Sequence, residues 1–253
     1  VVGTGDQAFG IINRGSIVGN GIYEGIDATA LRIGVDGGMA VTIDGGFRNS
    51  GTLLAISANG TATALIVDAN ASLPVVDNTA IIRALTTGDG AFEAVGVDYR
   101  AGATAGSLIN SGTIGAYVQG EASDAYAIRD TSGTLTSLTN RGVIEALVSP
   151  TDDEDDTDDD NLNAGDEVIT GRAVAIDLSA NTSGVTLVQE GINDGDDYAD
   201  GLADADADGD GVDDDDEPAI VGEILLGSGN DTVEIKTARC LATSRSATEP
   251  TPS

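Results

Sequence analysis

The chain has no histidine, no tryptophan and a single cysteine, Cys240, and aromatic residues make up only 3% of its 253 residues. Without histidine, neither a histidine-dependent catalytic triad nor a histidine-ligated zinc site can form. One cysteine allows no intramolecular disulfide and no zinc site built from several thiolates. The chain also has no P-loop and no dinucleotide-binding fingerprint. Most of the common catalytic centres are therefore excluded.

Positive charge is scarce as well, because 11 Lys and Arg residues stand against 43 Asp and Glu residues, for a formal net charge of −32. Such a surface repels phosphate backbones, so we expect no nucleic-acid partner. It suits an extracellular setting in which divalent cations screen the charge. No apolar run approaches about 18 residues, so we expect no membrane span. The chain begins with VVGTG and has no initial Met, so we expect a processed product or a fragment.

What the chain has in abundance is glycine, with 35 residues, and hydrophobic types make up 40%. This mixture favours strands and turns over helices. An Asn-centred motif recurs as INRGSIVG (12–19), RNSGTLLA (48–55), DNTAIIRA (77–84), INSGTIGA (109–116), TNRGVIEA (139–146) and, most weakly, VQEGIND (188–194). The motif is anchored at Asn13, Asn49, Asn78, Asn110, Asn140 and Gln189, at intervals of 36, 29, 32, 30 and 49 residues. The last interval falls to 32 when the acidic segment 151–167 is left out.

A second motif, a short strand that ends in Asp, keeps nearly the same period. It occurs as IGVD (33–36), LIVD (65–68), VGVD (95–98), AIRD (127–130) and VAID (174–177). Two motifs with one period indicate a true repeat. Apolar residues alternate as in strands, and Gly, Asn and Asp separate the short runs as turns require. We therefore predict an all-β fold, a parallel β-helix (β-solenoid) with about 30 residues per coil, roughly six coils and acidic loop insertions.

Stacked coils bring equivalent side chains into columns. The Asn column is expected to form an amide ladder, and the Gly two residues later to supply a turn with positive φ. Five stacked Asp residues would repel one another, so Asp36, Asp68, Asp98, Asp130 and Asp177 are expected to point to solvent or to pair with nearby Arg. Along the chain we expect β-helix coils over 1–150, an acidic insertion loop over 151–167, another coil over 168–192, an acidic calcium-binding loop over 193–218, final strands over 219–235 and an irregular tail over 236–253.

The phrases INSGTIGA, LTNRGVIEA, AVAIDLS and GEILLGSGNDTVEI resemble the passenger regions of bacterial autotransporters and related large surface repeat proteins. The resemblance covers about residues 8 to 235 and rests on composition, period and turn phrases. It implies a right-handed β-helix displayed outside the cell. The chain departs from the family in lacking a C-terminal translocator barrel, and its tail, KTARCLATSRSATEPTPS, breaks the strand pattern.

The stretch DADGDGVDDDDE (206–217) matches a calcium-loop template, D-x-[DN]-x-[DN]-G-x5-E. Alternate carboxylates on a tight Gly turn supply the six to eight oxygens that calcium prefers. The stretch resembles an EF-hand loop without flanking helices, and also the DxDxDG repeats of thrombospondin type 3 modules. We therefore predict a calcium site with ligands, including those for a possible second ion, drawn from Asp204, Asp206, Asp208, Asp210, Asp213, Asp215 and Glu217.

Two other segments have weaker patterns. The run TDDEDDTDDD (151–160) has no regular spacing and no Gly turn, so we interpret it as a solvated linker. LGSGNDTVEI (226–235) fits most of one calcium-binding nonapeptide, but that fold needs tandem copies, so we interpret it as a further β-helix turn.

Three hypotheses for function follow. The favoured one is a non-catalytic, calcium-stabilised structural or adhesive β-solenoid, extracellular and on a bacterial cell surface, with a surface or matrix partner or self-association. The second is a subunit of a filament or surface layer that stacks head to tail through its open strand edges. The third is a polysaccharide-active enzyme, with Asp98 and Arg100, or Arg129 and Asp130, as candidate residues. The scarcity of aromatic platforms argues against the third.

Overall fold

The computed structural model describes residues 8–88, 90–151, 168–192, 212 and 217–237, and these residues form an all-β molecule. Three parallel sheets, here named A, B and C, contain all but two of the strands. Within the described residues, no helix has the length and apolar character that a membrane crossing requires. The predicted fold class, a parallel β-solenoid, is therefore confirmed.

Each sheet takes one strand from every winding of the chain. Sheet A contains β1 (Ile11–Asn13), β5 (Phe47–Asn49), β9 (Val75–Asn78), β12 (Ser107–Asn110), β15 (Ser137–Asn140), β18 (Thr186–Gln189) and β21 (Thr232–Ile235). Sheet B contains β2 (Ser16–Asn20), β6 (Thr52–Ala58), β10 (Ile81–Thr87), β13 (Thr113–Gln119), β16 (Val143–Ser149) and β19 (Ala219–Val221). Sheet C contains β3 (Ala28–Ile33), β7 (Ala62–Val67), β11 (Glu93–Tyr99), β14 (Asp124–Asp130), β17 (Ala173–Asp177) and β20 (Glu223–Leu225). A small fourth sheet pairs β4 (Val41–Thr42) with β8 (Ala71–Ser72).

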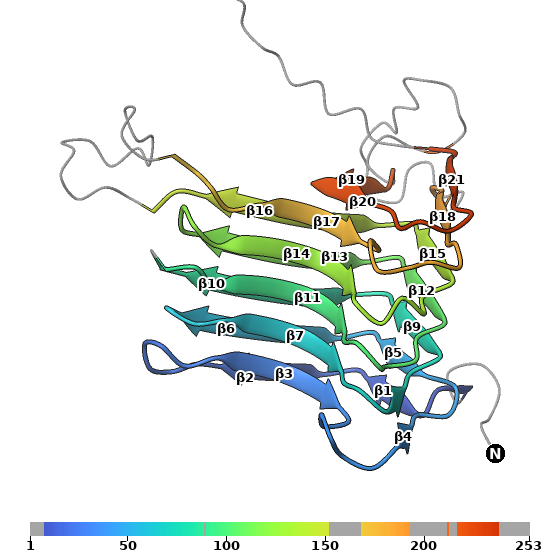
Figure 1. The fold of residues 1–253 in the computed structure, drawn as a ribbon, viewed down its shortest axis with the longest axis horizontal. Helices are drawn as coiled ribbons and strands as arrows, with labels where there is room; N and C mark the ends of the chain where they lie inside the picture. Colours follow the sequence, from blue (N-terminus) through green and yellow to red (C-terminus); the bar gives the residue numbers. More distant parts are fainter. Residues whose placement is uncertain (1–7, 89, 152–167, 193–211, 213–216, 238–253) are drawn as a thin grey trace, which may run out of the picture.

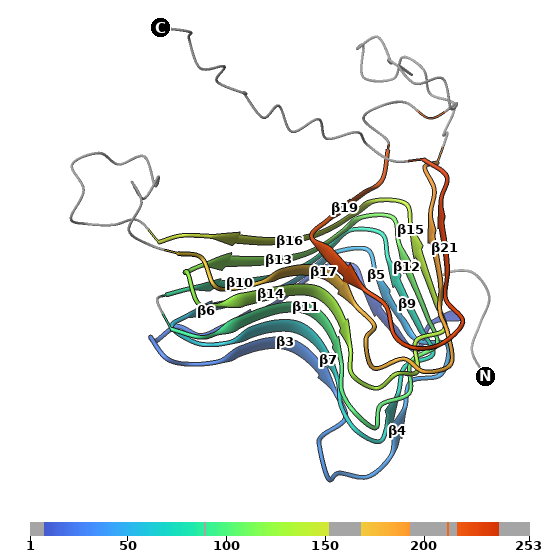
Figure 2. The ribbon, with the colours of Figure 1, turned by 45° about the horizontal axis from the view of Figure 1, so that its top comes forward.

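The windings stack as layers, from β2 and β3 at the bottom to β19 and β20 at the top (Figure 1). Sheet A lies at one end of each layer, beside sheets B and C (Figure 2). Four windings carry a full seven-residue strand in sheet B, whereas β2 has five residues and β19 three. The regular solenoid therefore amounts to about four turns, slightly fewer than the six predicted, because the first and last windings are shortened.

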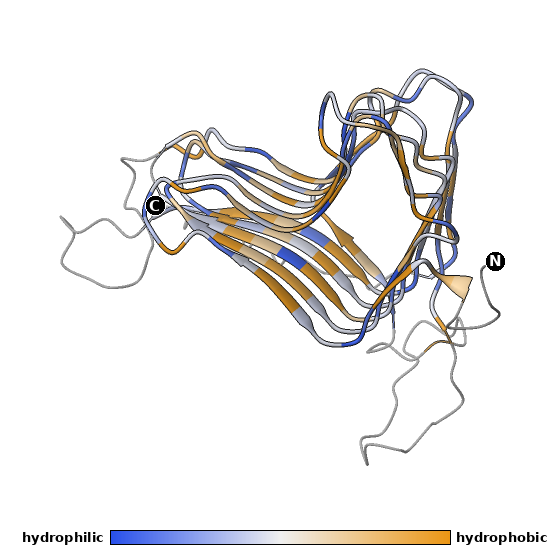
Figure 3. Cartoon of the chain, turned by 90° about the horizontal axis from the view of Figure 1, so that it is seen from below, coloured by the Kyte–Doolittle hydropathy of each residue, from blue (hydrophilic) through white to orange (hydrophobic). Residues whose placement is uncertain are grey.

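A column of apolar side chains runs through each sheet on its inner face. In sheet B, for example, Leu53, Ile82, Ile114 and Ile144 occupy one register position, and all four are fully buried. Apolar bands accordingly recur at the same place in successive strands (Figure 3). Burial of these columns is the main favourable contribution to folding. The core is built mainly from Ala, Val, Ile and Leu, as the composition predicted.

The Asn column forms the predicted amide ladder in sheet A. Each side-chain amide donates from Nδ2 to the side-chain oxygen one coil further on, at 2.8–3.2 Å, from Asn13 to Asn49, Asn78, Asn110, Asn140 and finally Gln189. All six side chains are buried. Because an amide is both a donor and an acceptor, identical residues satisfy one another on every coil.

The prediction that the Gly residues of the Asn-centred motif have positive φ was wrong. Gly51, Gly112 and Gly142 do not have positive φ. They permit close approach between coils, because a Cβ atom on Gly112 would lie 2.1 Å from the carbonyl oxygen of Ala80. Positive φ occurs instead at other turn residues, among them Asn59 and Asn70.

Candidate functional site

Most of the predicted calcium loop lies outside the described residues. This holds for Asp204, Asp206, Asp208, Asp210, Asp213 and Asp215, so the calcium site stays a prediction. Glu217, the last position of the template, is described and buried, with 8% of its surface exposed. The following residue, Pro218, accepts a hydrogen bond from Nε2 of Gln189 at 3.3 Å. The C-terminal end of the predicted loop is thus joined to the last residue of the amide ladder.

Val212 is a second residue of the predicted calcium-binding loop that the structure describes. Its side chain is buried and lies against Gly191, where an added Cβ atom would come within 2.5 Å of Val212 Cγ1. In the part of the chain that the structure describes, no group of three or more Asp, Glu, Cys or His side chains is arranged to hold a metal ion.

The segment 226–235 forms a β-helix turn followed by β21, as interpreted from the sequence. Oδ1 of Asp231 accepts a hydrogen bond from the backbone N–H of Val185 at 3.0 Å. A Cβ atom on Gly227 would lie 1.8 Å from the carbonyl oxygen of Asn181, so this glycine is required by the packing of one turn on another.

A network of carboxylates and guanidinium groups covers the outer face of sheet C. It consists of Arg32, Asp68, Glu93, Asp98, Arg100 and Arg129, and we call it the sheet C network. Asp68 pairs with Arg32 and with Arg100, the latter at 3.3 Å. Asp98 accepts from Nε of Arg100 and from Nε of Arg129, both at 3.1 Å. Both aspartates are buried, so the expected pairing with Arg is found but the alternative of solvent exposure is wrong for them.

The five Asp residues do not form a single column. Strand register places Asp98 beside Arg129, and Arg129 beside Asp177, whereas Asp130 lies opposite Tyr99. A column of identical carboxylates would concentrate like charge, and the register avoids this by placing Arg between Asp residues.

Asp130 has a different role from Asp98, because neighbouring residues of a strand point to opposite faces. Its carboxylate accepts hydrogen bonds from the backbone N–H groups of Ser132, Gly133 and Leu135 at 2.9–3.1 Å. It therefore closes the turn after β14. The proposed pair of Arg129 with Asp130 does not form, whereas the pair of Asp98 with Arg100 does.

The network changes the proton affinity of Arg129. Burial by itself lowers the pKa of this guanidinium, but hydrogen bonds and charge from Asp98 and Glu93 outweigh burial and raise the pKa above its ordinary value. The guanidinium also lies over the ring of Tyr126, 4.8 Å from its centroid. Burial, with the negative charges of Asp124 and Glu93, raises the pKa of Tyr126. Arg129 thus stays a fixed positive charge and not a proton donor.

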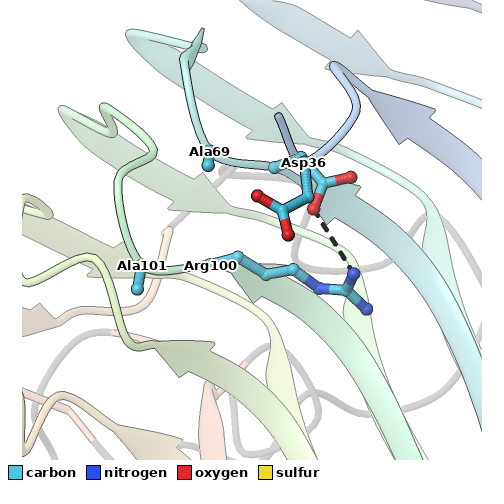
Figure 4. Close-up of a pocket in the computed structure, with 5 residues that line it drawn as sticks. Asp36, Ala69, Arg100 and Ala101 are labelled. Carbon is cyan, nitrogen blue, oxygen red and sulfur yellow. Dashed lines mark hydrogen bonds and ion pairs between the residues drawn. The ribbon is translucent and has the colours of Figure 1, made fainter. Parts of the chain in front are cut away.

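A hollow of about 330 Å³ opens beside this network, lined by Asp36, Asp68, Ala69, Arg100 and Ala101. Figure 4 shows the carboxylate of Asp36 near the ion pair of Asp68 with Arg100. The polar groups of the hollow are thus mostly engaged with one another. This arrangement stabilises the stacking of β7 on β11.

A second cluster, on the outer face of sheet B, was not predicted from the sequence. The guanidinium of Arg83 lies 4.9 Å from the ring centroid of Tyr117, and the Tyr117 hydroxyl donates to the carboxylate of Glu145. Burial and the neighbouring Glu145 raise the pKa of Tyr117 to about 12. The sequence does contain a pattern from which this cluster could have been predicted. The third residue of the strand that follows each Asn anchor is Arg83, Gly115 and Glu145 in three successive coils, so the two charges lie one coil to either side of Gly115.

Comparisons with known proteins add no family to this picture. No family model matches the chain, and no curated protein and no solved structure shows significant similarity to it. The resemblances to autotransporter passengers, EF-hand loops and thrombospondin type 3 repeats therefore stay interpretations of short sequence motifs. The structure supports only the architecture, a parallel β-solenoid.

Proposed function

We propose that this chain is a non-catalytic structural or adhesive β-solenoid of a bacterial cell surface, stabilised by calcium. The observation that carries the proposal is the amide ladder, which joins six buried side chains from Asn13 to Gln189 through consecutive hydrogen bonds. A ladder of this kind stiffens the stack of coils along the solenoid axis and leaves its own amide groups without free capacity for a ligand.

The outer polar groups support the same function. Asp68 and Asp98 are held by Arg32, Arg100 and Arg129, which bridge successive coils. Their chemistry is that of a structural cross-link between strands. A stack of coils that holds its shape suits a molecule that displays a surface outside a cell.

The calcium component rests on the sequence of 206–217 and on the position of its C-terminal end. Glu217 is buried beside the ladder terminus at Gln189 and Pro218. A buried carboxylate at the twelfth position of the template is placed to connect ion binding with the stability of the last coil. A net charge of −32 also makes binding of a divalent cation favourable.

Calorimetric titration of calcium into the whole chain tests this component. We expect heat of binding and a rise in melting temperature, both lost in the triple variant Asp206→Asn, Asp208→Asn, Asp210→Asn. The matched control is Asp152→Asn, Asp153→Asn, Asp155→Asn, which removes the same charge from the other acidic segment and should leave both signals. Equal losses in the two variants would reduce the effect to non-specific screening and contradict a calcium site.

A specific observation also favours head-to-tail assembly as a second candidate. Val233 and Ile224 continue the core columns of sheets A and C, yet they are 47% and 39% exposed, because no further strand of the described residues covers them. At the other end, Ile11 and Leu31 occupy the same columns and are only partly buried.

Electron microscopy of the purified chain with millimolar calcium and with chelator distinguishes the two candidates. Filaments that form with calcium and dissolve with chelator would establish the assembling form. Single short particles under both conditions would contradict head-to-tail assembly and favour an isolated structural or adhesive solenoid.

A further inference from the structure

The outer face of sheet B is almost uncharged and carries many large apolar side chains, in a chain in which 21% of residues are charged. The strands β2, β6, β10, β13, β16 and β19 contain two charged residues between them, Arg83 and Glu145. The larger apolar side chains at outward positions are Val18, Leu54, Ile56, Ile81, Leu85, Tyr117, Val143, Leu147 and Val221. We call this set, with Arg83 and Glu145, the sheet B face.

Strand alternation assigns these residues to the outside. In β6, Leu53 and Ala55 belong to the core and are fully buried, so Leu54 and Ile56 point the other way. Several members are strongly exposed, with Val18 at 52% and Leu147 at 42%. Contiguous apolar surface of this kind on a soluble protein is typical of an interaction site.

The two charges of the face lie on the two strands that flank β13. Arg83 of β10, Gly115 of β13 and Glu145 of β16 share one register column. Among the described residues, Arg83 has no ion pair with a carboxylate, and its buried Nε has no hydrogen-bond acceptor. Its contact is with the ring of Tyr117.

In the neighbouring column, the same three strands carry Leu85, Tyr117 and Leu147, whose side chains are largely apolar. Consider a second sheet B face laid on this one with its coil order reversed about β13. Apolar residues of this column then lie against apolar residues of the other face. Arg83 of each face lies against Glu145 of the other. The face is complementary to itself in both hydropathy and charge.

We propose that two copies of this chain pack through their sheet B faces, about a twofold axis that runs along β13. The strands of the two sheets then run nearly parallel and the coil order is antiparallel, which is an isologous contact. Arg83 of each copy pairs with Glu145 of the other across the gap of about 10 Å between stacked sheets. The proposal does not depend on calcium binding or on the function proposed above.

The size of the face suits a weak dimer. With the axis along β13, five strands of each copy, β6, β10, β13, β16 and β19, lie opposite one another, and at about 4.8 Å apart and up to seven residues long they span roughly 19 Å by 23 Å. Two such faces bury on the order of 900 Å² in total, close to the roughly 1,000 Å² expected of a specific interface. The two charge pairs fix the register and the apolar columns supply the affinity.

Sedimentation velocity of the whole chain in moderate salt is the test. The wild type is expected to be a dimer at about 100 µM. Arg83→Glu and Glu145→Arg each place like charges opposite one another, so we expect each to raise the dissociation constant at least about tenfold. The double variant Arg83→Glu, Glu145→Arg restores complementarity and should restore the dimer. Arg172→Glu and Glu223→Arg make the same changes of charge at an exposed pair on sheet C and should leave the dimer intact.

Cross-linking keeps the proposal testable if a reversal variant fails to fold. Thr113 lies on β13, so its two copies face each other across the axis. In a Cys240→Ser background, Thr113→Cys should cross-link with a short bismaleimide, and Thr131→Cys, beyond the end of β14, should not. The proposal would be overturned if the wild type sediments as a monomer at about 100 µM. It would also be overturned if the charge reversals at Arg83 and Glu145 raise the dissociation constant no more than the control reversals do. Equal cross-linking of Thr113→Cys and Thr131→Cys would overturn it as well.

Discussion

Two ladders run along this solenoid, and they solve the problem of stacking polar side chains in different ways. In sheet A the same residue, Asn, repeats over five coils, and each amide donates to the next. On the outer face of sheet C the charged residues alternate, with Asp98 between Arg100 and Arg129. A neutral amide can follow itself because it donates and accepts, whereas a carboxylate only accepts and must be followed by a donor of opposite charge.

The register shows how one repeat produces both ladders. Leu65 pairs with Val97, 32 residues later, whereas Asp68 and Asp98 are 30 residues apart. The difference of two residues moves Asp98 out of the column of Asp68. Asp68 thereby stacks with Arg100, and Asp98 with Arg129. A small irregularity in the period therefore separates like charges.

The largest expected effect comes from breaking the amide ladder. Asn110→Leu removes the acceptor for Asn78 and the donor to Asn140, and it buries the groups that are left unpaired. We expect a loss of about 3 kcal/mol in the free energy of unfolding, measured by urea denaturation. Asn20→Leu, at an exposed end of β2, is the control and should have little effect. Equal losses would show that the ladder contributes no more than a surface amide.

Breaking the sheet C network should cost somewhat less. Asp98→Ala leaves Arg129 and Arg100 without their shared acceptor, and Asp98 is only 2% exposed. Because Arg100 is partly solvated, we expect a loss of about 2 kcal/mol in the same assay. Arg172→Ala breaks the exposed pair with Glu223 and should cause no measurable loss. A loss in Arg172→Ala as large as in Asp98→Ala would contradict the importance of burial.

The close approach of coils beside the amide ladder provides a smaller test. Gly112→Ala places a Cβ atom against the carbonyl oxygen of Ala80, so the coils must separate locally. We expect a loss of about 1–2 kcal/mol, measured by thermal denaturation. Ala80→Gly makes the opposite change at the equivalent position and should lie within about 1 kcal/mol of the wild type. No loss in Gly112→Ala would mean that the repeat does not require glycine there.

The smallest effect is the dependence on alkaline pH at Tyr117. Its pKa is raised from 10.0 to about 12, first by burial and then by the hydrogen bond to Glu145. A raised pKa in the folded state stabilises it below pH 10, and this contribution is lost as the pH rises through about 12. Ultraviolet titration of the phenolate should therefore show a late-ionising tyrosine that disappears in Tyr117→Phe. A Tyr117 midpoint near pH 10 would contradict the partial burial of its hydroxyl and its hydrogen bond to Glu145.

Sequence reasoning succeeded where a pattern depends on local chemistry that every coil repeats. The amide ladder is such a case, because the spacing of Asn13, Asn49 and Asn78 is enough to align one amide above another. It failed for Gly51, Gly112 and Gly142 of the same motif, which lie in close contact with the neighbouring coil and do not have positive φ. For the Asp motif it predicted the pairing with Arg but not the strand register, because a register difference of two residues cannot be seen in a period near 30.

The sequence by itself determined that this protein is an acidic, repetitive, all-β chain whose coils stack in parallel. That conclusion rests on alternation and period, which are properties of neighbouring residues along the chain. Only the tertiary structure decided which side chains meet between coils, and so placed Asp98 against Arg129 and left Arg83 and Glu145 alone on an apolar face. Such contacts depend on strand register, which is set by the packing of whole coils and not by any single repeat.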